Sequence, residues 1–387
     1  MPRPARRLRV LLLFGGRSAE HDVSCVTAVA VARALDPERY EVVPVAITTE
    51  GDWLLAGEAR AALEKGATAL PTAFAVEGEP VRPPSVPAYQ EIVPRFAKPG
   101  GEPRSEIERA EGLAPDVVFP LLHGPYGEDG TVQGLLELAG LPYVGAGVLG
   151  SAVGMDKVMM KRAFAASGLP QARYLELRDG AGPGHDRDAF ATRVEAELGL
   201  PAFVKPANLG SSVGVSKAHD RAELDAAIAL AFEYDEWCVV EEAVVGREIE
   251  VAVLGDDPAE ASLPGEIVPG DEFYSYADKY EHARAELLVP APLDDARTAE
   301  VRSLAVRAFD ACRCEAMARV DFFLDDGPGG RGFLVNELNT IPGFTPISMY
   351  PKLWEASGLS YPALLDRLVD LALDRHERRA RRAGRQR

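Results

Sequence analysis

The feature that most constrains the fold is a pair of short apolar segments, each carrying polar residues two positions apart. Arg319 and Asp321 lie in the first segment, and Glu337 and Asn339 lie in the second. Because side chains alternate along a strand, two strands would direct each polar pair to one face. Neighbouring strands would then present three oxygen ligands and one guanidinium group to a common space. This set suits Mg²⁺ held against nucleotide phosphates, whereas any single one of these residues is typical of a solvated strand edge.

The charge of the chain limits the ligands that it can bind. The chain has 387 residues and a formal net charge of -18. Such an acidic chain is not built to coat nucleic acid, so we expect no nucleic-acid partner. An anionic ligand must instead meet a local cluster of cations. Only eight residues are lysines, so a lysine inside a motif-like segment carries more weight than usual.

The cysteines and the apolar runs favour a cytoplasmic protein without a membrane segment. The four cysteines form no C-x-x-C pair and lie beside apolar residues, which is typical of buried thiols in a reducing compartment. The basic start leads into the apolar run 10–14, which is too short for a signal peptide and ends at Gly15 without a cleavage pattern. No run approaches the length of a membrane span, so we expect no membrane partner.

The first 150 residues predict a doubly wound α/β unit. A buried strand at 8–14 is followed by a glycine turn that contains Glu20, and then by a helix that ends near Leu35. Further strands are predicted at 40–47 and 116–123, and a helix from 131 to about 140. His123 would then lie at the carboxyl end of a strand, where such sheets bind ligands, although a lone histidine is more often structural. Residues 78–115 are rich in Pro, Gly and charge, and predict an irregular insertion without an assigned function.

The second half predicts strands and loops that carry the rare lysines. Lys157 lies near the start of a helix, and Lys205 lies in a strand at 203–206 that leads into Gly210-Ser211-Ser212-Val213-Gly214. Small residues allow backbone N–H groups to approach phosphate oxygens, although the segment is not a P-loop and could be a simple turn. Strands are predicted at 239–242 and 247–254. The aromatic segment 273–280 predicts a loop that closes over a site. At the end of the chain, a terminal helix is predicted at 362–376, followed by a frayed basic tail at 377–387.

Taken together and in this order, the motifs resemble a D-alanine–D-alanine ligase, a member of the ATP-grasp superfamily. The resemblance rests on Glu20 in its glycine turn, His123 to Gly130, Lys157, Lys205 with Gly210 to Gly214, Lys279-Tyr280, Arg319 to Asp321 and Asn336 to Gly343. It implies an α/β fold, with α+β character in the C-terminal half, and three domains. The implied ranges are 1–152 for a parallel-sheet domain, 153–243 for a central domain and 244–376 for a C-terminal domain, with ATP between the last two.

The resemblance also implies a nucleotide and metal site. It implies ATP as co-substrate and two Mg²⁺ ions, with Mn²⁺ as a substitute. The metal ligands would be Asp321, Glu337 and Asn339. The residues implied for ATP are Lys157, Lys205 and Ser212 at the phosphates, Glu241, Glu242 and Val244 at the adenine, Glu248 at the ribose, and Lys279 at the transferred phosphoryl group.

The implied reaction joins two D-alanines, with ATP converted to ADP and phosphate through an acyl phosphate, for peptidoglycan precursor synthesis. Glu20 would pair with the first ammonium group and connect through Ser211 to Tyr280. The other implied roles are Arg319 and the Gly343 N–H at the oxyanion, and Ser348 and Met349 at the second carboxylate. The group that accepts the amine proton stays open among Tyr280, His123 and the substrate phosphate.

Two alternatives remain from the sequence. The first is a related ligase that uses D-lactate or D-serine as second substrate; Tyr280 favours D-alanine, whereas His282 lies only two residues further on. The second is a nucleotide-binding protein without turnover, against which Arg319 argues, since a pure binder needs no oxyanion group. The resemblance implies a homodimer formed through the N-terminal domain, and leaves a requirement for K⁺ open.

Overall fold

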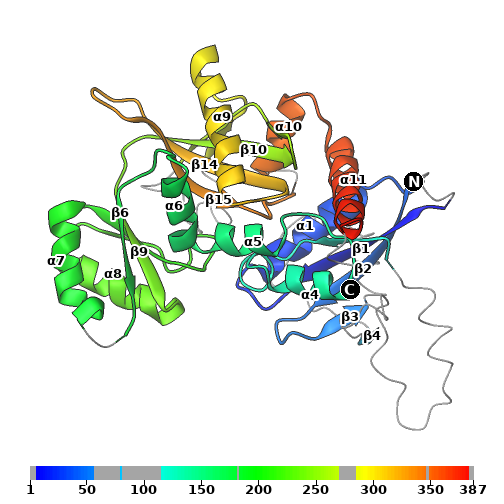
Figure 1. Ribbon diagram of the computed structural model, residues 1–387, viewed down its shortest axis with the longest axis horizontal. Helices are drawn as coiled ribbons and strands as arrows, with labels where there is room; N and C mark the ends of the chain where they lie inside the picture. Colours follow the sequence, from blue (N-terminus) through cyan, green and yellow to red (C-terminus); the bar gives the residue numbers. More distant parts are fainter. Residues whose placement is uncertain are drawn as a thin grey trace, which may run out of the picture.

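The computed structural model describes residues 6–55, 79–80, 115–180, 183–269, 285–345 and 348–382. Three sheets form three lobes, with helices α5 (Val148–Met155) and α6 (Lys157–Ala166) between them (Figure 1). Each sheet lies within one of the three ranges implied above, although the boundary after residue 152 falls inside α5. The positions of the domain boundaries stay a prediction.

The N-terminal sheet has a parallel centre and an antiparallel edge. Its order is β4-β3-β2-β1-β5; β1 pairs in parallel with β2 and β5, whereas β3 pairs antiparallel with β2 and β4. β1 is almost wholly apolar and buried, as a strand covered on both faces must be. The elements are β1 (Leu8–Gly15), α1 (His21–Ala34), β2 (Tyr40–Ile47), β3 (Trp53–Leu55), β4 (Glu79–Pro80), β5 (Val117–Pro120) and α4 (Thr131–Ala139).

The central sheet is antiparallel and is covered by two helices on one face. Its order is β6-β9-β7-β8. Helices α7 and α8 pack against it around a small apolar core. The elements are β6 (Tyr174–Arg178), a 3-10 turn (Pro183–His185), α7 (Arg187–Glu197), β7 (Ala202–Pro206), β8 (Ser216–Ala218), α8 (Arg221–Tyr234) and β9 (Trp237–Glu242).

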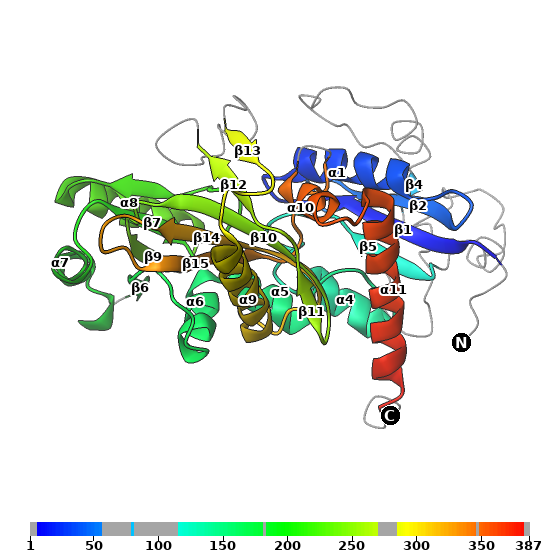
Figure 2. The ribbon, with the colours of Figure 1, turned by 90° about the horizontal axis from the view of Figure 1, so that it is seen from above.

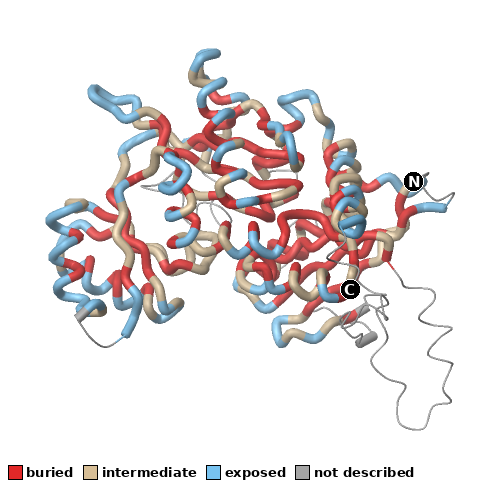
Figure 3. Tube along the Cα trace, in the orientation of Figure 1, coloured by how far each residue is buried: buried red, intermediate tan, exposed pale blue. Residues whose placement is uncertain are grey.

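The C-terminal sheet is antiparallel and more deeply buried than the central one (Figure 3). Its order is β13-β12-β10-β14-β15, with β11 paired to β10. Helix α9 packs on one face of this sheet (Figure 2). The elements are β10 (Arg247–Gly255), β11 (Ala259–Ala261), β12 (Gly265–Val268), β13 (Glu286–Leu288), α9 (Asp295–Ala311), β14 (Ala316–Asp325), β15 (Gly332–Asn339), α10 (Met349–Ala356) and α11 (Tyr361–Ala380).

Helix α11 joins the C-terminal part of the chain to the N-terminal sheet. Its buried Arg375 donates hydrogen bonds to the carbonyl oxygens of Gly145 and Tyr143. Arg378 and Arg379 form ion pairs with acidic residues of other elements. The predicted end of this helix near residue 376 is therefore wrong. The first part of the expected basic tail is helical, because its arginines have buried or acidic partners that the sequence alone does not reveal.

The other predicted elements that lie among the described residues agree with the structure apart from their ends, whereas the loop predicted at 273–280 lies outside the described residues. Helix α1 begins at His21, directly after Glu20, and β5 ends at Pro120, three residues before His123. Of the insertion 78–115, only β4 and Pro115 lie among the described residues. In the part of the chain that the structure describes, no helix has both the length and the apolar character needed to cross a membrane.

Candidate active site

Strands β14 and β15 bring the four polar residues together as their spacing predicts. The register places Asp321 opposite Glu337 and Arg319 opposite Asn339. The pairing register shifts between Asp321 and Phe322, where the four polar residues end and the apolar pairs begin. Asn339 Nδ2 donates to Asp321 Oδ2 at 3.0 Å, so the two strands are connected through side chains as well. The prediction of a shared face is confirmed.

Arg319 is held by carboxylates on two strands. Its Nε and Nη2 atoms donate to the two oxygens of Asp321, both at 2.7 Å, and Nε lies 3.1 Å from Oε2 of Glu250 on β10. Burial opposes the charge, but Asp321 and Glu250 outweigh it and raise the pKa of Arg319 well above its ordinary value. A fixed, permanently charged guanidinium group therefore faces the common space. Glu250 was not singled out from the sequence.

The other side of this space contains three lysines, which we call the lysine cluster: Lys157, Lys161 and Lys205. They come from α6 and β7, and they are three of only eight lysines in the chain. Lys157 donates to the carbonyl oxygen of Leu209, and Lys205 donates to Oδ1 of Asn336 on β15 at 3.3 Å. The cluster therefore connects the central sheet with the C-terminal sheet. Its positive charge suits a polyanion such as a phosphate chain.

Glu241 is the carboxylate at the centre of the lysine cluster. Its Oε1 lies 3.1 Å from Nζ of Lys161, and its Oε2 lies 3.2 Å from Nζ of Lys205. Burial opposes ionisation, but the two ammonium groups overcome it and lower the pKa of Glu241 to about 2. Glu241 is therefore an anion at neutral pH, and its oxygens can only accept hydrogen bonds. Lys161 was missed because nothing in its local sequence marks it.

The residues expected around the adenine and ribose lie at the end of β9, in the connection that follows it, and at the start of β10. The Glu242 carboxylate is engaged by Arg173 and Arg331, which leaves the backbone of this segment as its means of contacting a base. Val244 is half-buried in the connection between β9 and β10. Glu248 lies two residues before Glu250 on β10, so it faces the same side as the partner of Arg319.

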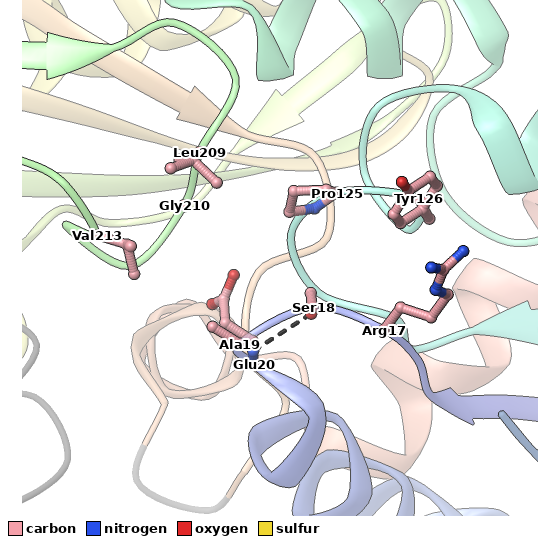
Figure 4. Close-up of a pocket in the computed structure, with 9 residues that line it drawn as sticks. All are labelled: Arg17, Ser18, Ala19, Glu20, Pro125, Tyr126, Leu209, Gly210 and Val213. Carbon is pink, nitrogen blue, oxygen red and sulfur yellow. Dashed lines mark hydrogen bonds between the residues drawn. The ribbon is translucent and has the colours of Figure 1, made fainter. Parts of the chain in front are cut away.

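Glu20 meets the glycine and serine loop, residues 210–214, across two lobes. Ser211 Oγ donates to Oε1 of Glu20, and Figure 4 shows the Glu20 carboxylate directed toward the backbone near Gly210. A Cβ atom at Gly210 or Gly124 would lie 2.9 or 2.8 Å from Oε2 of Glu20, so a side chain at either position would displace this carboxylate. Glu20 and Gly210 also line a pocket with Arg17, Ser18, Ala19, Pro125, Tyr126, Leu209 and Val213.

The backbone of the glycine and serine loop is itself unusual. Ser211 and Ser212 have φ angles of 48° and 59°, in the left-handed region that residues other than glycine seldom adopt. Such conformations persist where surrounding contacts hold them, and they occur often at ligand sites. The Ser211 contact with Glu20 is one of the contacts that hold this loop. The loop is therefore more than a simple turn between β7 and β8.

His123 and Glu128 lie buried beside Glu20. Thr27 Oγ1 lies 3.3 Å from Nε2 of His123, and burial lowers the pKa of His123 despite the opposing effect of Glu20. Glu128 accepts hydrogen bonds from the backbone N–H groups of Gly124 at 2.8 Å and Ile341 at 3.1 Å. Burial and the nearby Glu20 raise the pKa of Glu128 to about 8. Glu128 therefore joins the turn after β5 to the loop after β15.

Gly343 and Ser348 lie in that same loop, next to α10. Ser348 Oγ accepts from the backbone N–H of Thr345 at 3.1 Å, and a Cβ atom on Gly343 would lie 2.8 Å from it. Met349 is buried as the first residue of α10. The N–H groups at this helix start have no partner within the helix, which suits a carboxylate. Lys279 and Tyr280 lie outside the described residues.

The donor set fits a hard divalent cation that keeps several other ligands. Among the described residues, no group of three or more His, Cys, Asp or Glu side chains has the arrangement of a metal site. Asp321, Glu337 and Asn339 supply two carboxylates and one amide oxygen on paired strands. Mg²⁺ accepts such oxygen ligands and completes its shell with water and phosphate oxygens, so a small protein set is sufficient.

Comparison with known proteins identifies the class first. A solved structure of a D-alanine-D-alanine ligase from Coxiella burnetii has a TM-score of 0.79 and 35% identity, and the match covers 97% of each chain. The VanG D-Ala:D-Ser ligase from Enterococcus faecalis has a TM-score of 0.78 and 32% identity, with 95% of this chain and 99% of that chain covered. The chain therefore has the fold of these ligases, and the expected fold class is confirmed.

The sequence comparisons identify the family. Residues 9–146 match the family described as "D-ala D-ala ligase N-terminus", and residues 163–370 match "D-ala D-ala ligase C-terminus". A D-alanine--D-alanine ligase of Geobacillus kaustophilus (strain HTA426) is 46% identical over 96% of each chain. One of Mycobacterium sp. (strain JLS) is 49% identical over 96% of this chain and 97% of its own. The chain belongs to the D-alanine–D-alanine ligase family, an enzyme family of ADP-forming ligases that use ATP and a divalent metal ion.

Proposed function

We propose that this chain joins two D-alanines to D-alanyl-D-alanine, with ATP converted to ADP and phosphate, in the synthesis of a peptidoglycan precursor. The observation that carries this proposal is the contact between Glu20 and Ser211. It places a buried carboxylate, suited to an ammonium group, beside a loop suited to phosphate. A substrate that has both an ammonium group and a carboxylate to be phosphorylated fits between them.

The first step requires activation of a carboxylate. Its carbon is a poor electrophile because negative charge is delocalised over both oxygens, and transfer of the γ-phosphoryl group gives an acyl phosphate with a good leaving group. Lys157 and Lys205 would hold the phosphates, with Ser212 beside them. Glu20 would bind the ammonium group of the first D-alanine and direct its carboxylate toward the nucleotide.

Asp321, Glu337 and Asn339 would hold two Mg²⁺ ions, or Mn²⁺ in their place. When bound, these ions supply charge neutralisation at the phosphate oxygens. The arrangement of the three side chains on paired strands supports this assignment, because each can direct an oxygen to the same space. Glu248 would contact the ribose, and Glu241 with the backbone of residues 242–244 would contact the adenine.

The second step is attack by the amine of the second D-alanine on the acyl phosphate. Arg319 and the Gly343 N–H would stabilise the oxyanion of the tetrahedral intermediate, in which the carbonyl oxygen gains a full charge. Ser348 and the Met349 N–H would hold the second carboxylate at the start of α10. Lys279 and Tyr280 remain proposed as the residues that close the site and meet the transferred phosphoryl group. His123 is a candidate for the amine proton, and its lowered pKa keeps the ring neutral at neutral pH, although it also makes the ring a weaker base.

A second candidate function has D-serine in the second position. The match with the VanG D-Ala:D-Ser ligase supports it, since 32% identity over nearly the whole chain leaves the second subsite free to differ. D-alanine is preferred because the two ligases from Geobacillus and Mycobacterium are closer in sequence, at 46% and 49% identity.

The experiment that tests the function measures phosphate release from ATP. The enzyme is supplied with D-Ala, L-Ala, D-Ser or D-lactate, each alone and each paired with D-Ala, and the product is identified by mass. We expect release with D-Ala alone and a dipeptide of two alanines. Absence of ADP formation that depends on D-Ala would refute the proposal, whereas a mixed D-Ala–D-Ser product at the higher rate would support the second candidate.

We further propose that the enzyme acts in the cytoplasm as a homodimer. ATP is a cytoplasmic substrate, and the four cysteines are free and buried, as is usual for proteins in a reducing compartment. Light scattering of the purified protein tests the dimer. A mass near the 41.6 kDa of one chain would contradict it.

A further inference from the structure

Lys161 is a wholly buried cation with no assigned role. Its side chain has 0% exposure, and its Nζ lies 3.1 Å from Glu241 Oε1 and 5.5 Å from the centre of the Tyr174 ring. A buried ammonium group is costly unless it is paired with an anion. The anion that pairs with Lys161 is Glu241, which is proposed to contact the adenine. The buried pair therefore suggests a role in nucleotide binding.

Lys161 and Lys205 both pair with the Glu241 carboxylate, but the two side chains differ in their exposure. Lys205 binds the other carboxylate oxygen at 3.2 Å, retains 12% exposure, and also contacts Asn336 on the C-terminal sheet. Lys161 extends from the buried face of α6, and its side chain is wholly buried, so it cannot meet a bound nucleotide directly. Lys205 can therefore turn toward a phosphate chain, whereas Lys161 remains with the carboxylate.

We propose that Lys161 is a positioning residue that neutralises Glu241, so that Lys205 is released from the carboxylate to bind the phosphates of the nucleotide. This inference rests on the proposed function, because it assumes that Lys205 meets the phosphates. Without Lys161, Glu241 would pair with Lys205 alone and would bind it more tightly. The phosphates must then compete with a buried carboxylate for Lys205.

The pKa shifts of Lys161 and Lys205 agree with these different roles for the two lysines. Burial lowers the pKa of Lys161, so its charge depends on the Glu241 carboxylate. Burial also opposes the charge of Lys205, but Glu241 and Glu337 outweigh it and raise its pKa. Loss of Lys161 concentrates the attraction of Glu241 on Lys205. Loss of both Lys161 and the Glu241 charge removes the competitor.

The test compares the binding of ADP and adenosine, with Mg²⁺ present, by calorimetry. The dissociation constant of adenosine divided by that of ADP reports the contribution of the phosphates, and its measurement requires no turnover. We expect Lys161→Met to reduce this ratio by about tenfold, which is the effect of about one pKa unit of interaction. We expect Lys161→Met combined with Glu241→Gln to restore the ratio toward the wild-type value. Arg162→Met, on the exposed side of the same helix, is the matched control and leaves the ratio unchanged.

The rescue by the second substitution is what a merely structural role would not produce. If Lys161 only supported the fold, the double variant would bind ADP no better than the single one. A wild-type ratio in Lys161→Met, or no recovery in the double variant, would overturn the proposal. If Lys161→Met does not fold, Lys161→Gln replaces it in the same comparison. A wild-type enzyme that binds ADP but forms no dipeptide would refute the proposed function and not the role of Lys161.

Discussion

The candidate active site has two buried, charged ends, and their charges are unbalanced in opposite directions. At the nucleotide end, three lysines lie around the Glu241 carboxylate, and Glu337 is also near Lys157 and Lys205. At the other end, which we call the acidic end, the Glu20 carboxylate lies beside His123, whose pKa is lowered by burial, and beside Glu128, whose pKa is raised to about 8 and which is therefore mostly protonated at neutral pH. Neither arrangement is favourable for folding alone, because buried charges lose their hydration.

The difference indicates which part of each substrate belongs at each end. Excess positive charge stabilises phosphates, and excess negative charge stabilises an ammonium group. Arg319, with its partners Asp321 and Glu250, lies between the two ends, where a carboxylate would meet a phosphoryl group. Substitutions at the two ends should therefore affect different substrates, and the variants below test this difference.

The largest effect is expected for Glu337→Gln. The substitution retains the shape of the side chain but removes the charge of a proposed metal ligand opposite Asp321. We expect kcat to fall by about a thousandfold, because charge neutralisation by the metal is worth several kcal/mol in the transition state. Steady-state phosphate release measures kcat, with Glu355→Gln at an exposed position of α10 as control. Unchanged activity and ATP affinity would refute the metal assignment.

Arg319→Ala should lower kcat by about a hundredfold, which is the usual effect of removing one oxyanion donor. ATP binding should remain close to wild type, because the lysine cluster is untouched. Calorimetry with ATP in the absence of D-alanine separates the two effects. A large loss of ATP affinity would mean that Arg319 contributes to nucleotide binding and does not lie between the two ends of the site.

Glu20→Gln tests the acidic end alone. Removing the charge should raise the KM for the first D-alanine by about thirtyfold, because an ammonium group would lose its buried partner. The KM for ATP should change little. Rates measured over a range of each substrate give both constants, with Glu38→Gln in an exposed loop as control. Equal effects on both constants would show that the two ends are not independent.

Glu128→Gln should change the pH dependence of stability more than activity. The pKa of Glu128 is raised to about 8 in the folded chain, above the ordinary value of 4.5. The folded state therefore keeps a proton that the unfolded state loses, and the contribution to stability is complete below pH 4.5 and lost as pH rises through about 8. Glutamine is neutral throughout. We expect the melting temperature of the wild type relative to Glu128→Gln to fall between pH 5 and pH 8 and then to level off; parallel curves would contradict the raised pKa.

Much of the active site can be predicted because its residues lie in local patterns. The alternation around Arg319 and Asp321 predicts a strand and a shared face, and the register with β15 confirms this face. Glu20 and Ser211 belong to glycine-rich segments that the sequence marks as turns. Their contact spans 191 positions, and it was expected only through resemblance to a family.

The residues that the sequence did not reveal share one property: their roles depend on distant partners. Lys161 lies 80 positions before Glu241, and Glu128 lies 213 positions before Ile341. Nothing next to either residue differs from an ordinary helix or turn. The same is true of Arg378 and Arg379, which resemble a solvated tail until their acidic partners are known.

Periodicity and motif order are local properties of the chain, so the strands, the glycine turns and the family can be predicted from the amino-acid sequence alone. Only the folded chain reveals which polar groups are buried together: Lys161 with Glu241, Glu128 with two backbone N–H groups, and Arg319 with Glu250. These pairs cannot be predicted locally, because pKa values and ion pairs depend on burial and on the distance between charges. Both arise only when distant segments pack.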